Sequence, residues 1–328
     1  MSEINLIEAI RQGMDEEMAR DPTIFITGED VGPRGGVFRA TQGLYEKYGD
    51  FRVIDSPLAE LSIIGVGIGA AMNGLRPICE IQFADFIYPA FNQIASEAAK
   101  MYYRSNGQWR LPLIIRAPYG GGIGGGLYHS QSIEAFFTHI PGLKVVIPST
   151  PYDAKGLLKS AIRDDNPVLF LEHKKAYRLL KGEVPGGEYT VPLGQAGVTR
   201  SGDDLSVYAY GLMHHFAHQA AEVVEREDGI SVEIIDIRTL LPLDKATILE
   251  SFKKTGKALI VYEDNEFMGY GAELAAILGS DGFEYMDGPI TRLAGPNIPA
   301  MPFSHPMQEF FMVSPDKIVK AIRELAAY

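Results

Sequence analysis

The chain has 328 residues, 46% of them hydrophobic, and this size predicts a globular protein of about two domains. No apolar run approaches the length of a membrane-spanning helix. The net charge of −12 argues against general binding of nucleic acid, whose phosphates attract basic proteins. The single cysteine, Cys79, excludes an internal disulfide and favours a reducing, cytoplasmic setting.

The N-terminal segment predicts an amphipathic helix and not a signal peptide, because its apolar side chains recur at helical spacing. They are Ile4, Ile7, Ile10, Met14 and Met18. Beyond them, short apolar runs alternate with helical patterns, which is typical of a parallel sheet covered on both faces. The expected strands are Thr23–Thr27, Phe51–Ile54, Pro77–Phe83, Leu111–Ala117, Leu143–Ile147 and Pro167–Leu171. Ser56-Pro57 and Thr150-Pro151 each place a capping oxygen before a proline and predict a helix start.

The regular pattern fades between residues 177 and 197. The polar, glycine-containing stretch Lys181–Tyr189 is the expected link between two domains. A second alternating series follows, with strands at 205–210, 231–237 and 258–262 and helices at 215–227, 244–252, 270–278 and 314–327. We therefore expect an α/β protein with two parallel-sheet domains, residues 1–190 and residues 191–328.

Unusual residues follow four consecutive strands of the first domain. They are Gly28–Gly32, Asp55–Glu60, Phe83–Phe86 and Tyr119–Ser132. Because open parallel sheets bind ligands at the carboxyl ends of their strands, these segments should meet at one rim of the sheet.

Glu60 lies in the first turn of an expected helix whose remaining residues, Leu61–Met72, are almost entirely apolar. This composition predicts a buried helix, with Gly65 and Gly69 on one face for close packing. A carboxylate at the start of such a helix is either a partner of the helix dipole or a catalytic group. Composition alone favours the dipole partner.

His129 follows the glycine-rich stretch Gly120–Gly126, where the backbone can approach a ligand closely. No Gly-Lys-Ser/Thr ending is present, so this is not a phosphate-binding P-loop. Both a catalytic and a structural role remain open for His129. The three histidines at the expected start of another helix match no metal-ligand motif and indicate a solvated helix end; they are His214, His215 and His218.

Seven motifs in this order resemble the beta subunits of 2-oxo-acid dehydrogenase complexes, from about Ile4 to the C-terminus. They are Gly28-Glu-Asp-Val-Gly32, Asp55-Ser-Pro-Leu-Ala-Glu60, Gly74-Leu-Arg-Pro77, Gln82-Phe-Ala-Asp-Phe86, His129-Ser-Gln-Ser132, Pro141-Gly-Leu-Lys-Val145 and Ile237-Arg-Thr-Leu240. The segment Leu127–Phe137 is most similar to the branched-chain type, 3-methyl-2-oxobutanoate dehydrogenase (2-methylpropanoyl-transferring). Pyruvate and acetoin types remain alternatives.

The resemblance implies a pyrimidine-binding domain followed by a transketolase-type C-terminal domain. It implies oxidative decarboxylation of 2-oxo acids with thiamine diphosphate, and transfer of the acyl group to lipoyl groups. The expected partners are an alpha subunit, in an α2β2 tetramer, and a lipoyl acyltransferase core. The Gly-Asp-Gly motif with which alpha subunits hold the magnesium diphosphate is missing here. This chain would therefore supply half of a shared site.

The resemblance also implies residue roles. Glu60 would hydrogen-bond a ring nitrogen of the pyrimidine, Phe86 would pack on the ring, and Gln82 would line the same pocket. His129 would lie near the substrate carboxylate and the incoming lipoyl group. Glu29 would belong to an acidic tunnel between paired sites.

Family members often hold a structural potassium ion with backbone carbonyls. The matching positions are Leu113, Ala161, Ile162, Asp164 and Asn166. Oxygen ligands suit this cation, although an ordinary helix end capped by water or side chains has the same appearance. Asn297 departs from the family, since many members have aspartate at this position on the surface that docks on the acyltransferase core.

Two other functions fit the sequence less well. A single-chain, transketolase-like synthase would be far longer and would carry its own Gly-Asp-Gly motif. A non-catalytic scaffold subunit would have no need of both Glu60 and His129, and both are present.

Overall fold

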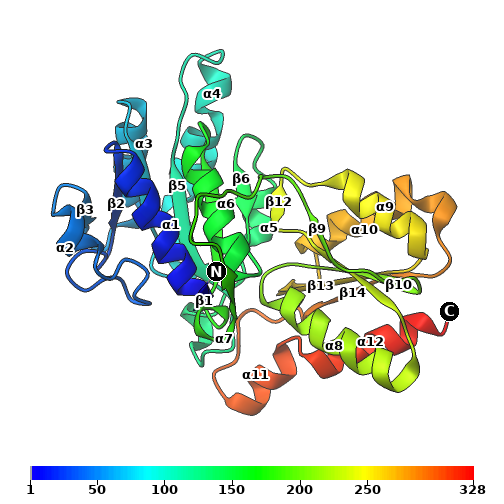
Figure 1. Cartoon of the computed structure of the whole chain (residues 1–328). Coiled ribbons are helices and arrows are strands. Elements are labelled where there is room, and N and C mark those ends of the chain that lie inside the picture. Colours follow the sequence, from blue (N-terminus) through cyan, green and yellow to red (C-terminus); the bar gives the residue numbers. More distant parts are fainter. Residues whose placement is uncertain (1) are drawn as a thin grey trace. The chain divides into compact units, whose positions relative to one another are not determined.

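The computed structural model describes residues 2–328, which divide into two compact units. Unit 1 contains the chain up to Tyr119 together with Phe136–Leu193, and unit 2 contains Gly120–Ala135 together with Gly194–Tyr328. A segment from the first half of the chain thus belongs to the second unit, which the sequence pattern does not indicate. Both units are α/β, as predicted (Figure 1). Among residues 2–328, no helix is both long enough and apolar enough to cross a membrane.

Unit 1 is built on a parallel sheet with the strand order β6-β7-β5-β4-β2-β3. Its strands are β2 (Ile24–Gly28), β3 (Val53–Asp55), β4 (Arg76–Glu80), β5 (Ile114–Tyr119), β6 (Lys144–Val146) and β7 (Val168–His173). All six predicted strands are confirmed within a few residues. Every residue of β2, β5 and β7 is buried, so both faces of the sheet centre are covered.

Helices of several lengths surround this sheet. They are α1 (Leu6–Arg20), α2 (Leu44–Tyr48), α3 (Glu60–Met72), α4 (Met101–Arg104), α6 (Pro151–Arg163) and α7 (Ala176–Leu179), and α5 (Glu134–Thr138) runs across the division between the two units. A short antiparallel ribbon joins β1 (Ser2–Asn5) to β8 (Lys181–Val184). The expected link at residues 181–189 therefore begins as a strand, because its backbone pairs with the N-terminus. The predicted N-terminal helix starts only at Leu6, where Asn5 caps it.

One of the two predicted helix starts is confirmed and the other is wrong. Thr150 caps α6, its hydroxyl accepting the N–H of Asp153 at 3.1 Å. Ser56 caps no helix, because its N–H donates to the carbonyl of Gly28 at 2.8 Å and keeps the chain extended beside β2. Helix α3 consequently begins only at Glu60, with no side-chain cap.

Helix α3 is only half covered, so the prediction of a buried helix is wrong for the single chain. Its inner face is buried, but Leu61, Val66 and Met72 are 49%, 61% and 43% exposed. A Cβ added to Gly65 or Gly69 would meet nothing within 4 Å. These residues leave an open apolar strip along α3, which we name the α3 face and define as Leu61, Gly65, Val66, Gly69 and Met72.

The helix approaches its own sheet at a different glycine. A Cβ added to Gly67 would lie 2.5 Å from the sulfur of Cys79 on β4. Gly67 therefore permits close packing inside this chain, whereas Gly65 and Gly69 leave space outside it.

A buried ion group crosses the sheet of unit 1. The fully buried guanidinium of Arg116 on β5 binds Glu172 on β7 through two bonds of 2.6 and 2.7 Å, and Glu80 on β4 through one of 2.6 Å. The hydroxyl of Tyr177 donates to Glu172 at 2.6 Å. Burial raises the pKa of Glu80, while the charge of Arg116 opposes this shift. Since removing one partner of a buried pair leaves an uncompensated charge, this group ties three strands together.

Unit 2 contains a five-stranded sheet with the order β14-β13-β10-β11-β9. Strands β10 (Leu205–Ala209), β11 (Val232–Asp236), β13 (Ala258–Asn265) and β14 (Ile290–Gly295) are parallel, and β9 (Gly197–Arg200) is an antiparallel edge. A further short strand is β12 (Thr239–Leu241). The three strands predicted here are confirmed. Edge strands β9 and β14 were not predicted, because their half-exposed residues lack a continuous apolar run.

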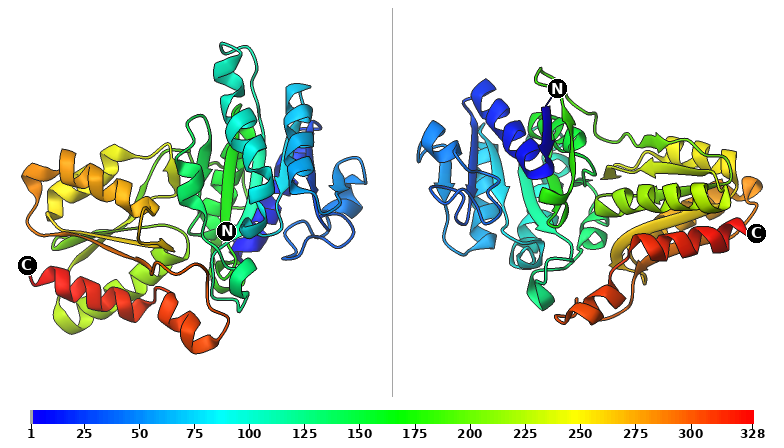
Figure 2. Two further views of the ribbon diagram at one scale, coloured as in Figure 1. Left: turned by 180° about the vertical axis from the view of Figure 1, so that it is seen from behind. Right: turned by 60° about the horizontal axis from the view of Figure 1, so that its bottom comes forward.

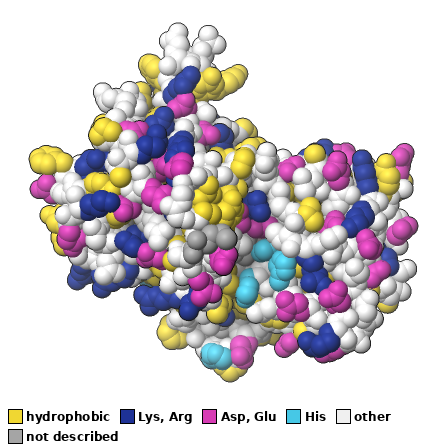
Figure 3. Space-filling view, in the orientation of Figure 1, with side chains coloured by type: hydrophobic (Ala, Val, Ile, Leu, Met, Phe, Trp, Pro, Cys, Tyr) yellow, Lys and Arg dark blue, Asp and Glu magenta, His cyan; other side chains and the backbone are white. Residues whose placement is uncertain are grey.

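Two groups of helices cover this second sheet. They are α8 (Leu212–Asp228) and α12 (Pro315–Ala326), which lie side by side, and α9 (Lys245–Thr255) and α10 (Tyr270–Asp281) on the other face (Figure 2). The short α11 (His305–Phe311) precedes α12. On the face drawn in Figure 3, basic and acidic side chains are interspersed and form no field of a single sign.

Candidate active site

Two carboxylates occupy the carboxyl end of the sheet in unit 1. Glu29 directly follows β2, Glu60 opens α3, and both side chains are half-buried. Burial raises the pKa of Glu29, and the negative charges of Asp30 and Glu60 raise it further. The structure therefore brings Glu29 and Glu60 close enough to repel each other, and a cationic or protonated group beside them would relieve that repulsion.

The loop between these carboxylates is held by Asp55, a residue for which the sequence suggested no role of its own. Its carboxylate accepts the backbone N–H of Gly32 at 2.6 Å. A Cβ on Gly32 would lie 2.8 Å from the same carboxylate, so only glycine allows this approach. The loop after β2 is thereby fixed against the end of β3.

An aromatic group follows the neighbouring strand β4. Phe86 ends a short helical turn, Ala84–Phe86, and its ring centroid lies 5.5 Å from that of Phe83. Phe83 in turn lies 5.3 Å from Phe38, edge to face. Gln82 and Phe86 are both half-buried. Because β4 pairs with β2 up to Glu80 and Gly28, Gln82 and Glu29 follow adjacent strand ends.

His129 belongs to unit 2, whereas the other predicted site residues belong to unit 1. Its loop, Gly120–Ala135, contains four glycines with positive φ, at Gly120, Gly122, Gly124 and Gly126. The loop closes on itself, since the N–H of Gly120 donates to the carbonyl of Gln131 at 2.9 Å. His129 itself is half-buried.

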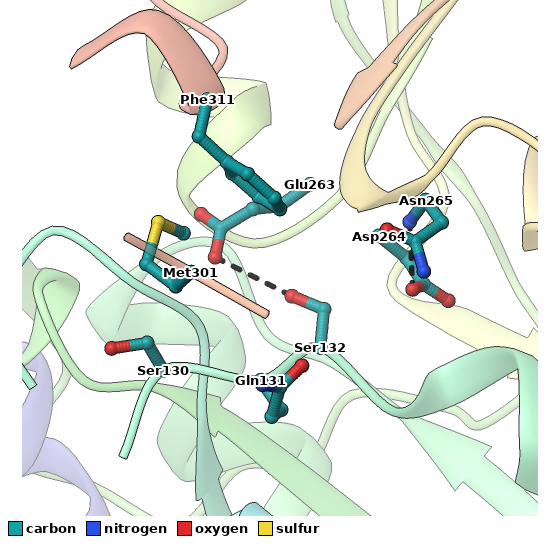
Figure 4. A pocket seen from close by; sticks show the side chains of 8 residues that line it. All are labelled: Ser130, Gln131, Ser132, Glu263, Asp264, Asn265, Met301 and Phe311. Atoms are coloured by element: carbon teal, nitrogen blue, oxygen red, sulfur yellow. Dashed lines mark hydrogen bonds between the residues drawn. The ribbon is translucent and has the colours of Figure 1, made fainter. Parts of the chain in front are cut away.

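A small polar cavity of about 20 Å³ lies in unit 2 beside this loop, with room for about one water molecule. It is lined by Ser130, Gln131, Ser132, Glu263, Asp264, Asn265, Met301 and Phe311 (Figure 4). Glu263 is nearly fully buried, and one of its oxygens accepts the N–H of Gly121 at 2.5 Å and the hydroxyl of Ser132 at 3.4 Å. Glu263 and Asp264 belong to no motif that the sequence singled out. The available signal was the pair of acidic residues ending the apolar run 258–262.

The carboxyl groups near this cavity are unusually hard to ionise. Burial raises the pKa of Glu134 to about 8, with a further contribution from the charge of Asp264. Burial likewise raises the pKa of Asp264 to about 6. The hydroxyl of Tyr210 donates to Glu134 at 2.9 Å, which partly offsets its loss of hydration.

The carbonyls predicted as potassium ligands gather around the end of α6 in unit 1, and several already accept hydrogen bonds. The carbonyls of Ile162 and Asp164 accept the guanidinium of Arg76 at 3.1 and 3.0 Å. The carbonyls of Leu113 and Ala161 accept backbone N–H groups at 2.9 and 3.1 Å. Since each carbonyl oxygen has a second lone pair, a cation could still be coordinated.

Metal ions can also be bound by side chains, in addition to backbone carbonyls. Over residues 2–328, no group of three or more His, Cys, Asp or Glu side chains is arranged to hold a metal ion. The three helix-start histidines accordingly form no such cluster. His214 and His218 instead both contact the hydroxyl of Thr199, at 2.8 and 2.9 Å.

The raised pKa of Glu134 predicts that the chain loses stability as pH rises from about 4.5 towards 8. Over this range the folded chain keeps a proton that the unfolded chain releases. Glu134→Gln stays neutral and still accepts the bond from Tyr210. We expect its melting temperature, measured from pH 6 to 9, to fall less than that of the wild type.

A carboxylate on the surface provides the control for this experiment. Glu225→Gln alters a surface ion pair with Arg200 and should leave the pH dependence of the melting temperature unchanged. If the melting temperatures of wild type and Glu134→Gln fell in parallel between pH 6 and 9, Glu134 would be ionised in the folded chain.

Two models of protein families match the chain. Residues 2–179 match the transketolase pyrimidine-binding domain, and residues 194–318 match the transketolase C-terminal domain. A solved chain titled split gene transketolase, inactive beta4 tetramer, has the same fold, with a TM-score of 0.80 and 22% identity over 99% of this chain and 98% of that one. Domains of this kind imply dependence on thiamine diphosphate.

Relatives of known name agree with these domains. The 2-oxoisovalerate dehydrogenase subunit beta of Bacillus subtilis (strain 168) is 60% identical over the whole of both chains. The pyruvate dehydrogenase E1 component subunit beta of Acholeplasma laidlawii is 47% identical over 99% of both. The predicted family is therefore confirmed, and the chain belongs to the beta subunits of the 2-oxo-acid dehydrogenases.

Proposed function

We propose that this chain is the beta subunit of a branched-chain 2-oxo-acid dehydrogenase. With an alpha subunit it would decarboxylate 3-methyl-2-oxobutanoate and related 2-oxo acids and pass the acyl group to a lipoyl group. The supporting observation is the 60% identity to a 2-oxoisovalerate dehydrogenase subunit over full length, against 47% to a pyruvate dehydrogenase subunit. A panel of 2-oxo acids given to the chain co-purified with its alpha subunit tests this choice. Preference for pyruvate would favour the second candidate.

The carboxyl end of the unit 1 sheet fits the aminopyrimidine end of thiamine diphosphate. When bound, this cofactor supplies a carbon nucleophile and the electron sink for decarboxylation. Glu60 would hold a proton at a ring nitrogen, and the repulsion between Glu60 and Glu29 favours a protonated partner there. The half-buried ring of Phe86 would pack on the pyrimidine, and Gln82 would line the pocket.

His129 would act on the substrate and on the lipoyl group that accepts the acyl product. Its imidazole can donate a hydrogen bond to the carboxylate of the 2-oxo acid or give a proton to the incoming lipoyl group. Glu29 remains proposed as part of an acidic path between paired sites. A non-catalytic scaffold is disfavoured, since a scaffold has no need of the carboxylate pair Glu29 and Glu60.

The missing diphosphate-binding motif calls for a second subunit, and we place its contact on the α3 face. Helix α3 begins at Glu60, so the subunit that brings the diphosphate must approach this helix. Its exposed apolar side chains and its two glycines facing open space suit a closely packed helix. The α2β2 stoichiometry, the lipoyl acyltransferase core and a cytoplasmic location complete the proposal.

Asn297 affects the proposed docking on the acyltransferase core. Its side-chain oxygen accepts the N–H of Phe267 at 3.0 Å. An aspartate could accept the same bond, so the substitution removes a negative charge while this loop contact is kept. We propose that docking here depends less on charge than in members that carry aspartate.

Glu60→Gln should remove most activity while leaving the fold intact. Glutamine can still bond to the ring, but it cannot stabilise a protonated nitrogen as a carboxylate does. Loss of a charge-assisted bond in a dry site should lower activity by about a hundredfold or more. Exchange of the thiazolium proton with deuterated solvent, in the assembled complex with cofactor bound, measures this step without substrate.

The matched control is Glu8→Gln, which changes a glutamate in the first turn of α1. As a helix-dipole partner it should cost about 0.3–1 kcal/mol of stability and leave exchange unchanged. If Glu60→Gln behaves like this control, Glu60 is only a dipole partner.

Gly65→Leu should block assembly without harming the fold of the chain. A Cβ at this position meets nothing within 4 Å in this chain, and leucine favours helix more than glycine does. The variant should melt no lower than the wild type alone, yet fail to form the particle with the alpha subunit in analytical ultracentrifugation.

Gly67→Leu gives the contrast for the assembly test. It forces a clash with Cys79 and should destabilise the chain itself. Normal assembly of Gly65→Leu with the alpha subunit would exclude the α3 face as the contact. Loss of self-association alone would assign this face to a second copy of the chain.

A potassium ion at the carbonyl group near Asp164 should stabilise the assembled complex. We expect a melting temperature higher by about 2–4 °C in potassium chloride than in tetramethylammonium chloride at equal ionic strength. A bulky organic cation cannot enter a carbonyl cage. Equal melting in both salts would mean that Arg76 alone satisfies these carbonyls.

A further inference from the structure

We propose that Glu263 is a positioning residue that holds the loop carrying His129, an inference that rests on the proposed function for the role of His129. Glu263 lies near the end of β13 in unit 2, far along the chain from the loop at Gly120–Ala135. The glycines of that loop give its backbone little conformational preference of its own. Apart from the bond between Gly120 and Gln131, its geometry therefore depends on contacts from outside the loop.

The contacts of Glu263 bracket His129. One carboxylate oxygen accepts the N–H of Gly121, eight residues before His129, at 2.5 Å. The same oxygen accepts the hydroxyl of Ser132, three residues after His129, at 3.4 Å. A single atom thus ties both arms of the loop to the strand; Figure 4 shows the bond to Ser132.

The next residue on the strand extends this attachment. Asp264 accepts the N–H of Asn265 at 2.7 Å and also that of Ala135, the last residue of the loop segment. Two consecutive carboxylates at the end of β13 therefore hold the beginning and the end of the loop. This arrangement explains why the segment belongs to unit 2 although it is encoded within the first domain.

Packing around the loop leaves little freedom for a substitute. A Cβ on Gly121 would lie 2.5 Å from Met301, and one on Gly125 would lie 2.7 Å from the Cβ of His129. Met301 packs with Phe311 and Met312 in a buried cluster. A larger residue at position 121 would press against the end of the Met301 side chain, beside the N–H that donates to Glu263.

The side chain of Glu263 matters through its reach as well as its charge. Glutamate places its oxygen at Gly121, whereas aspartate is shorter by one carbon–carbon bond of about 1.5 Å. Glutamine keeps both the reach and an acceptor oxygen, with a neutral bond about half as strong. The pair Glu263→Gln and Glu263→Asp therefore separates position from charge.

The test uses the complex assembled with its alpha subunit. Glu263→Asp should lower acylation of a free lipoyl domain by about a hundredfold, because a displacement of about 1 Å at a catalytic group has this effect. Glu263→Gln should lose no more than about tenfold. Glu233→Asp shortens another buried carboxylate on the same sheet, one paired with Lys254, and should leave the rate unchanged.

Two further measurements distinguish positioning from a general loss of stability. Adding Glu263→Asp to His129→Ala should cause no additional loss of acylation, since residues that act through one group are not additive. Hydrogen exchange at the amide of Gly121 should accelerate in Glu263→Asp and stay slow in Glu233→Asp. This exchange can be followed in the purified chain and needs no activity.

The outcomes are decisive in both directions. Unchanged exchange at Gly121, or losses that multiply in the double variant, would overturn the positioning role. A wild-type complex inactive on every 2-oxo acid would instead remove the proposed function, while hydrogen exchange would still decide whether Glu263 holds the loop.

Discussion

A guanidinium that has no access to water fixes the geometry of unit 1. Arg116, in the middle of β5, binds Glu80 at the carboxyl end of β4 and Glu172 near that of β7, and its charge is compensated only while both carboxylates keep their positions. The strands cannot slide past each other without exposing an uncompensated charge to a dry interior. The residues that follow these strands, Gln82 and Phe86 among them, are consequently presented from a rigid edge.

Much of the fold could be predicted from sequence because apolar runs report burial directly. The central strands β2, β5 and β7 are buried along their whole length and largely apolar, as strands covered on both faces are, and the sequence predicts them within a few residues. The edge strands β9 and β14 were not predicted, because half-exposed positions interrupt the apolar run. The sequence of β8 contains glycine and predicts a loop. Its pairing with β1 joins residues far apart in the chain, and no local pattern reports such pairing.

The site residues were predicted mainly from long motifs. A motif does not show which distant residues hold its side chains in place. Glu60 and His129 stood out from their local surroundings, but Glu263 lies more than a hundred residues from the loop it contacts. No local pattern joins these positions, since only the folded chain brings β13 to Gly121. The opposite error occurred at α3. An apolar composition predicts that a helix is buried. It does not indicate whether the helix is buried by its own chain or by another chain.

The exposed α3 face affects how a cell must produce this protein. A water-exposed apolar strip with two glycines invites association with any complementary helix, including another copy of the same chain. A cell that synthesises this chain in excess over its partner would accumulate molecules prone to pair wrongly or to be degraded. If the alpha subunit covers this helix as proposed, balanced synthesis of the two subunits is a physical requirement of the exposed α3 face.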